Sequence, residues 1–156
     1  MKTGLVGEKL GHSFSREIHS LLGNTEYRNF EMPREELAGF MARRDFDGVN
    51  VTIPYKTDVI PMLDYVSDEA RAIGAVNTVV NRGGRLYGYN TDFFGMRELL
   101  IKNNIPVCGS DVLILGTGGT SKTAKAVCES LGAVSVTKVS RHPEEGEISY
   151  GEAKEK

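Results

Sequence analysis

The sequence predicts an α/β protein with a mostly parallel sheet, and three observations lead to that fold class. Short apolar strands alternate with amphipathic helices over residues 5–73, which is typical of parallel sheets. Residues 76–89 then show a hairpin pattern centred on Gly83 and Gly84. Residues 111–131 run from a continuous apolar strand through a glycine-rich turn into a helix, the order in which dinucleotide-binding domains begin.

Composition narrows the partners that the chain is expected to have. Its 156 residues carry a formal net charge of -2 without a basic stripe, so neither nucleic acid nor a membrane surface is expected. Cys108 and Cys128 lack the spacing of metal ligands, which predicts free thiols and no metal site. No apolar run reaches the roughly 20 residues of a membrane span, and the first residues lack a signal-peptide core. We therefore expect a cytoplasmic protein that acts on a small molecule.

The first predicted unit is a strand at residues 5–7, a polar loop and a helix at residues 16–22. Ile18 and Leu21 have helical spacing, and Ser15 is placed to cap the helix. A hydroxyl beside the free N–H groups of a helix start attracts an anion, so Ser13 and Ser15 are candidate ligands for one. The alternative is that the two serines only cap the helix and hold a turn.

A strand at residues 27–32 and a helix at residues 33–41 follow, with Leu37, Phe40 and Met41 as the expected core stripe.

Polar side chains lie in and just after the carboxyl end of the next strand, at residues 48–51. The β-branched residues there indicate an interior strand, and Pro54 ends it because proline cannot donate to a ladder. Asn50, Thr52 and Lys56 then lie where open α/β sheets bind ligands. A solvated lysine after a turn is the alternative for Lys56.

Helical segments are expected at residues 58–63 and 67–73, before the hairpin and a helix at residues 93–102. Asn77 precedes the first hairpin strand, and Asp92 follows the second. Each has an alternative role: Asn77 as a turn residue, and Asp92 as the cap of the following helix.

A polar break around Pro106 places the domain boundary, with one domain at residues 1–103 and another at residues 104–156. The strand at residues 111–115 reads as buried on both faces, and a second strand is expected at residues 134–139. Arg141 follows that second strand, where NAD enzymes keep an acid, and an arginine there accepts a 2′-phosphate; a surface arginine is the alternative. The candidate cofactor-binding residues are Gly116, Thr117, Gly118, Gly119, Thr120, Ser121, Ser140 and Arg141.

Five local patterns, in their order along the chain, resemble the shikimate dehydrogenase family. They are the serine loop at residues 7–20, N-V-T-I-P-Y-K at residues 50–56, G-A-V-N-T at residues 74–78, N-T-D at residues 90–92 and the glycine loop at residues 116–121. The chain departs from the family at Lys9 and Arg16, where proline is usual, and at residues 140–142, where S-R-H replaces Asn-Arg-Thr.

The resemblance implies a substrate-binding α/β domain followed by the first part of a Rossmann-type NADP-binding domain. It also implies reversible, NADPH-dependent reduction of 3-dehydroshikimate to shikimate, a step towards chorismate and the aromatic amino acids. Lys56 and Asp92 would be catalytic, because an ammonium stabilises a forming alkoxide and a carboxylate orients it. The implied substrate-binding residues are Ser13, Ser15, Asn50, Thr52, Lys56, Asn77 and Asp92.

Two alternatives remain: a quinate dehydrogenase that uses NAD, and a non-catalytic nucleotide or metabolite sensor on the same fold. A homodimer is also left open. Because a doubly wound sheet has strands beyond the first β-α-β unit, the chain as given is expected to have little dehydrogenase activity by itself.

Overall fold

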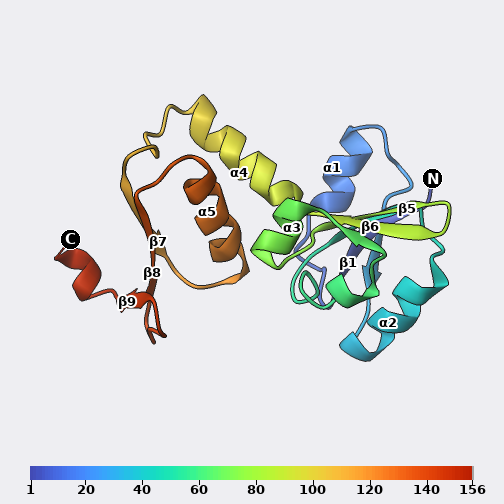
Figure 1. The fold of residues 1–156 in the computed structure, drawn as a ribbon. Coiled ribbons are helices and arrows are strands. Elements are labelled where there is room, and N and C mark those ends of the chain that lie inside the picture. Colours follow the sequence, from blue (N-terminus) through green and yellow to red (C-terminus); the bar gives the residue numbers. More distant parts are fainter. Residues whose placement is uncertain (156) are drawn as a thin grey trace. The chain divides into compact units, whose positions relative to one another are not determined.

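The computed structural model describes residues 1–155, and the chain forms two compact units (Figure 1). The first unit runs from Met1 to Thr91, and the second begins at Asp92. Helix α4 (Thr91–Lys102) therefore lies almost entirely in the second unit. The functional boundary expected after residue 103 stays a prediction, because a compact unit and a functional domain need not end at the same residue.

A six-stranded sheet in the order β2-β1-β3-β5-β6-β4 forms the first unit. The strands are β1 (Thr3–Gly7), β2 (Arg28–Glu31), β3 (Gly48–Val51), β4 (Tyr65–Val66), β5 (Thr78–Arg82) and β6 (Arg85–Tyr89). β1 pairs in parallel with β2 and β3, and β4 pairs in parallel with β6. β5 pairs antiparallel with both β3 and β6. The expected mostly parallel α/β sheet is confirmed.

The predicted hairpin is formed by β5 and β6, which turn at Gly83 and Gly84. Their φ values of 60° and 83° lie in the left-handed region, where a side chain would be strained. β4, in contrast, was not expected from the sequence. It has only two residues, too few for an alternating pattern to be recognised.

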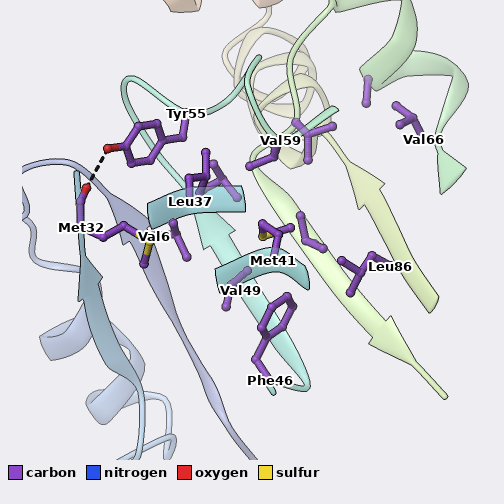
Figure 2. Close-up of a cluster of buried hydrophobic side chains, with 14 residues drawn as sticks. Val6, Met32, Leu37, Met41, Phe46, Val49, Tyr55, Val59, Val66 and Leu86 are labelled. Atoms are coloured by element: carbon purple, nitrogen blue, oxygen red, sulfur yellow. Dashed lines mark hydrogen bonds between the residues drawn. The ribbon is translucent and has the colours of Figure 1, made fainter. Parts of the chain in front are cut away.

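The core of the first unit lies between the sheet and helix α2 (Arg34–Arg43) (Figure 2). Leu37 and Met41 are each 1% exposed, and Phe40 packs against the same cluster, so the predicted stripe is confirmed. Burying such a side chain contributes about 1.5–3 kcal/mol to stability. Tyr55 is also fully buried here, and its hydroxyl donates to the Met32 carbonyl at 2.7 Å.

Two further helical segments join the strands of this unit. Helix α3 (Asp68–Ile73) is capped by Ser67, whose hydroxyl accepts from the Ala70 N–H at 3.3 Å. The 3₁₀ segment η1 (Ile60–Met62) lies within the helical turn expected at residues 58–63.

Helix α1 (Ser15–Leu21) differs from the prediction in two ways. Phe14, and not Ser15, is its N-cap residue, so the expected capping role of Ser15 is wrong. The physical reason is that the Ser13 hydroxyl accepts from the Ser15 N–H at 3.2 Å, which draws Ser15 into the first turn. The helix also buries none of its residues, and Ile18 and Leu21 are exposed despite their helical spacing.

The second unit contains α4 and a parallel sheet in the order β7-β8-β9. Its remaining elements are β7 (Asp111–Leu115), α5 (Gly119–Ser130), β8 (Ser135–Ser140), β9 (Glu147–Ser149) and the 3₁₀ segment η2 (Glu152–Lys154). Helix α5 packs on β7 and β8. β7 is an edge strand with Leu115 70% exposed, so the expectation of a strand buried on both faces is wrong. Apolar sequence alone cannot reveal whether a neighbouring layer covers each face.

Within residues 1–155, no helix is both long enough and apolar enough to cross a membrane.

Candidate functional site

Four segments of the first unit meet at one end of its sheet. β1 and β3 are parallel, so Gly7 and Val51 finish at the same end. β5 runs antiparallel to β3 and therefore starts there, and β6 finishes there in turn. Backbone hydrogen bonds join these termini: Thr52 N–H to the Val6 carbonyl at 2.9 Å, and Asn77 N–H to the Tyr89 carbonyl at 3.0 Å. The topology thus gathers the polar residues that follow β1, β3 and β6 and precede β5.

The loop after β1 brings two predicted site residues into contact. Ser13 and Ser15 are half-buried, and their hydroxyl oxygens lie 3.1 Å apart. Gly7 allows this loop to approach the sheet, because a Cβ there would lie 2.5 Å from Leu10 Cδ2 and 2.8 Å from Thr52 Cγ2. The absence of a side chain at Gly7 therefore lets the serine loop and Thr52 lie against the same strand end.

A cavity of about 540 Å³ opens between the serine loop and the end of β3. Three predicted site residues, Ser13, Ser15 and Thr52, contribute to its lining. Lys9 and His12 also line it, although the sequence did not single them out as ligands. The two hydroxyls and the Lys9 ammonium suit a small carboxylate, whereas the Glu8 carboxylate, which also lines the cavity, would repel an anion bound close to it. Lys9 and His12 lie in the same loop as the two serines, and that position was the only sign in the sequence that they could line the site. A loop sequence does not show which of its side chains face a cavity.

Asn50 and Asn77, predicted from separate motifs, belong to one hydrogen-bonded chain. The Asn50 Nδ2 group donates to Thr78 Oγ1 at 3.3 Å, and the Thr78 hydroxyl donates to Asn77 Oδ1 at 3.0 Å. Asn77 Oδ1 also accepts from the Thr91 backbone N–H at 2.8 Å. Asn77 is 7% exposed, so these bonds hold its amide firmly. Thr78 and Thr91 are structural partners that sequence reasoning missed.

Lys56 lies in the turn after β3 and is half-buried. Its carbonyl accepts from the Val76 N–H at 2.7 Å, which holds this turn against the segment leading to Asn77. Asp92 lies in the first turn of α4 and is not its cap, because the helix already begins at Thr91. Lys56 belongs to the first unit and Asp92 to the second, so their action as a pair stays a prediction.

The second unit carries a cavity of about 460 Å³ at the carboxyl ends of β7 and β8. It is lined by Gly116, Thr117, Gly118, Val139, Ser140, Arg141, His142 and Tyr150. The loop carrying Arg141 is held by Ser140, whose hydroxyl oxygen accepts from the His142 N–H at 3.2 Å. Five predicted cofactor residues thus share one cavity, and Tyr150 is an aromatic side chain that the prediction did not include.

The residues of this cavity fit a nucleotide phosphate. Gly116 has φ 116°, and a Cβ added at Gly116, Gly118 or Gly119 would meet open space, so the glycine turn presents bare backbone. Gly119, Thr120 and Ser121 form the first turn of α5, where the helix dipole favours an anion. The Ser121 hydroxyl is buried and has no hydrogen-bond partner among the described residues. Arg141, which lines the same cavity, can supply bidentate donors to a phosphate.

These features define a class of protein: an α/β domain with a polar cavity at one end of its sheet, followed by a β-α-β unit whose glycine turn borders a second cavity. Residues 5–79 match the model of the shikimate dehydrogenase substrate binding domain. The shikimate dehydrogenase (NADP(+)) of Clostridium beijerinckii is 44% identical over 127 residues, covering 76% of this chain and 47% of that protein. The chain belongs to the shikimate dehydrogenase family.

Solved structures agree with this family. Shikimate dehydrogenase 1 from Peptoclostridium difficile is 42% identical with a TM-score of 0.83, covering 99% of this chain and 62% of its own. The Thermus thermophilus shikimate 5-dehydrogenase in complex with NADP(H) and shikimate is 36% identical with a TM-score of 0.82. That match covers 94% of this chain and 58% of the Thermus chain. The chain thus spans roughly half to two thirds of the length of these relatives.

Proposed function

We propose that the chain carries the substrate site and the phosphate-binding start of the cofactor site of an NADP-dependent shikimate dehydrogenase. The observation that carries this proposal is the cavity lined by Ser13, Ser15 and Thr52, which lies within the span of the substrate-binding family. A carboxylate and ring hydroxyls need several hydroxyl and amide partners in fixed positions. The chain supplies them from three separate loops at one end of the sheet.

In this proposal the substrate carboxylate binds to the hydroxyls of Ser13 and Ser15. Lys9, which lines the same cavity, adds a positive charge nearby. The ring hydroxyls would be held by the side chains of Asn50 and Thr52. The amide of Asn77 and the carboxylate of Asp92 would complete this set. Charge-assisted hydrogen bonds are about twice as strong as neutral ones, so the carboxylate would fix the orientation of the ring.

Lys56 and Asp92 would handle the proton of the reacting hydroxyl. NADP⁺, held by the glycine turn and Arg141, would supply the hydride acceptor for the carbon that carries this hydroxyl. In shikimate oxidation Lys56 takes the hydroxyl proton as the carbonyl forms, and in the reverse direction it returns that proton. Asp92 would orient the Lys56 ammonium and stabilise its charge.

Arg141 would select NADP over NAD, because its guanidinium can bind the 2′-phosphate through two parallel hydrogen bonds. Its place in the cavity that also contains the glycine turn supports this role. The Rossmann character of the second unit, a cytoplasmic location and a homodimer remain predictions alongside it.

Calorimetric titration of the chain with shikimate and with quinate tests the substrate assignment. We expect shikimate to bind, Ser13→Ala and Ser15→Ala each to weaken binding by roughly tenfold, and quinate to bind less tightly. Ser20→Ala is the matched control, since Ser20 is an exposed serine on α1. Absence of shikimate binding, or equal affinities for the serine variants and the control, would refute the proposal.

Titration with NADP⁺ and NAD⁺ separates the remaining alternatives. A chain that binds NADP⁺ and shikimate supports the dehydrogenase. Tight NAD⁺ and quinate binding would favour the quinate enzyme. A sensor is favoured if a longer protein containing this sequence binds both ligands yet transfers no hydride between them.

A further inference from the structure

Tyr27 lies directly before β2, outside every motif that the sequence analysis assigned to the site. Its side chain is 2% exposed and packs in a small cluster with Leu5 and Leu10. Those two leucines also line the cavity of Ser13, Ser15 and Thr52. Tyr27 therefore lies immediately behind the wall of the candidate substrate site.

The ring of Tyr27 also stacks on His19 of α1. The two rings stack with their centroids 3.8 Å apart and their planes 7° from parallel. The stack joins α1, which starts at Ser15 and buries none of its residues, to the segment just before β2. The tyrosine ring is thus held by the stack on His19 and by its packing with Leu5 and Leu10.

The hydroxyl of Tyr27 donates to Asn50 Oδ1 at 2.8 Å. This bond is the first of a series that continues from Asn50 Nδ2 to Thr78 Oγ1 at 3.3 Å and from Thr78 to Asn77 Oδ1 at 3.0 Å. Tyr27 is joined in this way to both asparagines of the candidate site.

The Thr91 backbone N–H determines the direction of the whole series. A backbone N–H can only donate, so the atom of Asn77 that it contacts at 2.8 Å must be the acceptor Oδ1. Thr78 then uses its single proton on Asn77 and accepts from Asn50 Nδ2. The Asn50 atom that faces Tyr27 must in turn be Oδ1, which leaves the tyrosine hydroxyl as the donor.

We propose that Tyr27 is a positioning residue whose hydroxyl holds the Asn50 amide in one orientation and so sets the hydrogen-bonding pattern that the site offers to substrate. The substrate part of this inference rests on the proposed function. Burial raises the pKa of Tyr27 to about 12, so the hydroxyl keeps its proton at neutral pH. Without that donor, Asn50 Oδ1 loses its partner, and only the 3.3 Å bond from Asn50 Nδ2 to Thr78 Oγ1 still holds the amide, so the amide can move about that single contact.

Tyr27→Phe removes the hydroxyl and keeps the ring that stacks on His19. The first measurement is the side-chain amide resonance of Asn50 in the ligand-free 156-residue chain. We expect this resonance to move or broaden in Tyr27→Phe, whereas the Asn77 amide, held by the Thr91 N–H, changes much less. Tyr55→Phe is the matched control. It also deletes a buried tyrosine hydroxyl, but that hydroxyl donates to the Met32 carbonyl at 2.7 Å and not to Asn50. An Asn50 resonance that is unchanged in Tyr27→Phe would overturn the proposal.

The second measurement is a double-mutant cycle on shikimate affinity. Tyr27→Phe should weaken binding by about threefold to tenfold, the scale of one hydrogen bond. In an Asn50→Ala background the same substitution should have no further effect, because the amide it positions is gone. If the loss is equally large in that background, Tyr27 acts only through general packing and its positioning role is wrong.

The two measurements separate this inference from the proposed function. If the unmutated chain does not bind shikimate, the proposed function fails, and the positioning role is decided by the Asn50 resonance alone. If shikimate binds and the resonance does not respond to Tyr27→Phe, the function stands and the positioning role is rejected.

Discussion

Replacing Asn77 with alanine should destabilise the first unit as well as weaken ligand binding. Asn77 Oδ1 accepts three hydrogen bonds, from the Thr91 N–H at 2.8 Å, the Thr91 hydroxyl at 3.2 Å and the Thr78 hydroxyl at 3.0 Å. The side chain that makes them is 7% exposed. Alanine removes the shared acceptor, so all three donors lose a partner at once.

The expected loss in free energy of unfolding is about 2 kcal/mol. A shielded donor left without a partner costs about 1–3 kcal/mol. That penalty applies in part to the Thr91 N–H, because its bond to Asn77, a side chain only 7% exposed, is part-buried. Thr91 is exposed, so water can reach its hydroxyl, and Thr78 can turn to Thr91 Oγ1 at 3.3 Å. These two hydroxyls should therefore add little to the penalty.

Urea unfolding, followed by the amide resonances of β3 and β5, measures this loss. With a slope of about 1–3 kcal/mol per molar urea, the midpoint should fall by about 1 M. Asn77→Asp keeps an oxygen acceptor and should lose less stability, yet it removes the Nδ2 donor and should still weaken shikimate binding. Asn29→Ala, on the exposed edge strand β2, is the control. An Asn77→Ala midpoint within error of the control would refute the hydrogen-bond reasoning.

Three further outcomes are expected. In a form of the protein that turns over shikimate, Lys56→Ala should lower kcat by about 10²-fold or more with a smaller change in substrate binding, and steady-state kinetics would contradict this if kcat is unchanged. Arg141→Asp should erase or reverse a preference for NADP⁺ over NAD⁺ in calorimetric titration, and equal affinities in the unmutated chain would make Arg141 a surface charge only. The Lys138 ammonium, 2.7 Å from the Glu147 carboxylate, holds the pKa of that carboxyl below its usual range, as does the Glu144 N–H. The pairing of β8 with β9 should thus have its full stability above about pH 4.3, the unfolded value, and lose it as the pH falls through the lower folded pKa; hydrogen exchange along β9 that is independent of pH after correction for intrinsic rates would contradict this.

The positions of most strands and helices followed from local sequence. The strand at residues 48–51 and the Gly83-Gly84 hairpin agree with their predictions, because β-branched residues and proline restrict the backbone, and glycine permits the left-handed conformation that this turn needs. The polar residues at strand ends could be recognised for the same reason. Helix caps were less predictable: Ser13 and Ser15 are both suitable residues, and only the local geometry shows which hydroxyl accepts the bond.

Tertiary structure alone decided how these pieces meet. The antiparallel insertion of β5 beside β3 brings Asn77 and Thr91 to the end of the sheet where β1 and β3 finish. Tyr27 and Asn50 are 23 residues apart, and no pattern in either segment predicts their hydrogen bond. The sequence by itself determined the fold class, the family motifs and the candidate side chains, since these depend on backbone preferences and residue chemistry within short segments. Which candidates share a cavity, which amide atom faces which donor and which apolar strand is covered depend on contacts between distant segments, and those contacts exist only once the chain has folded.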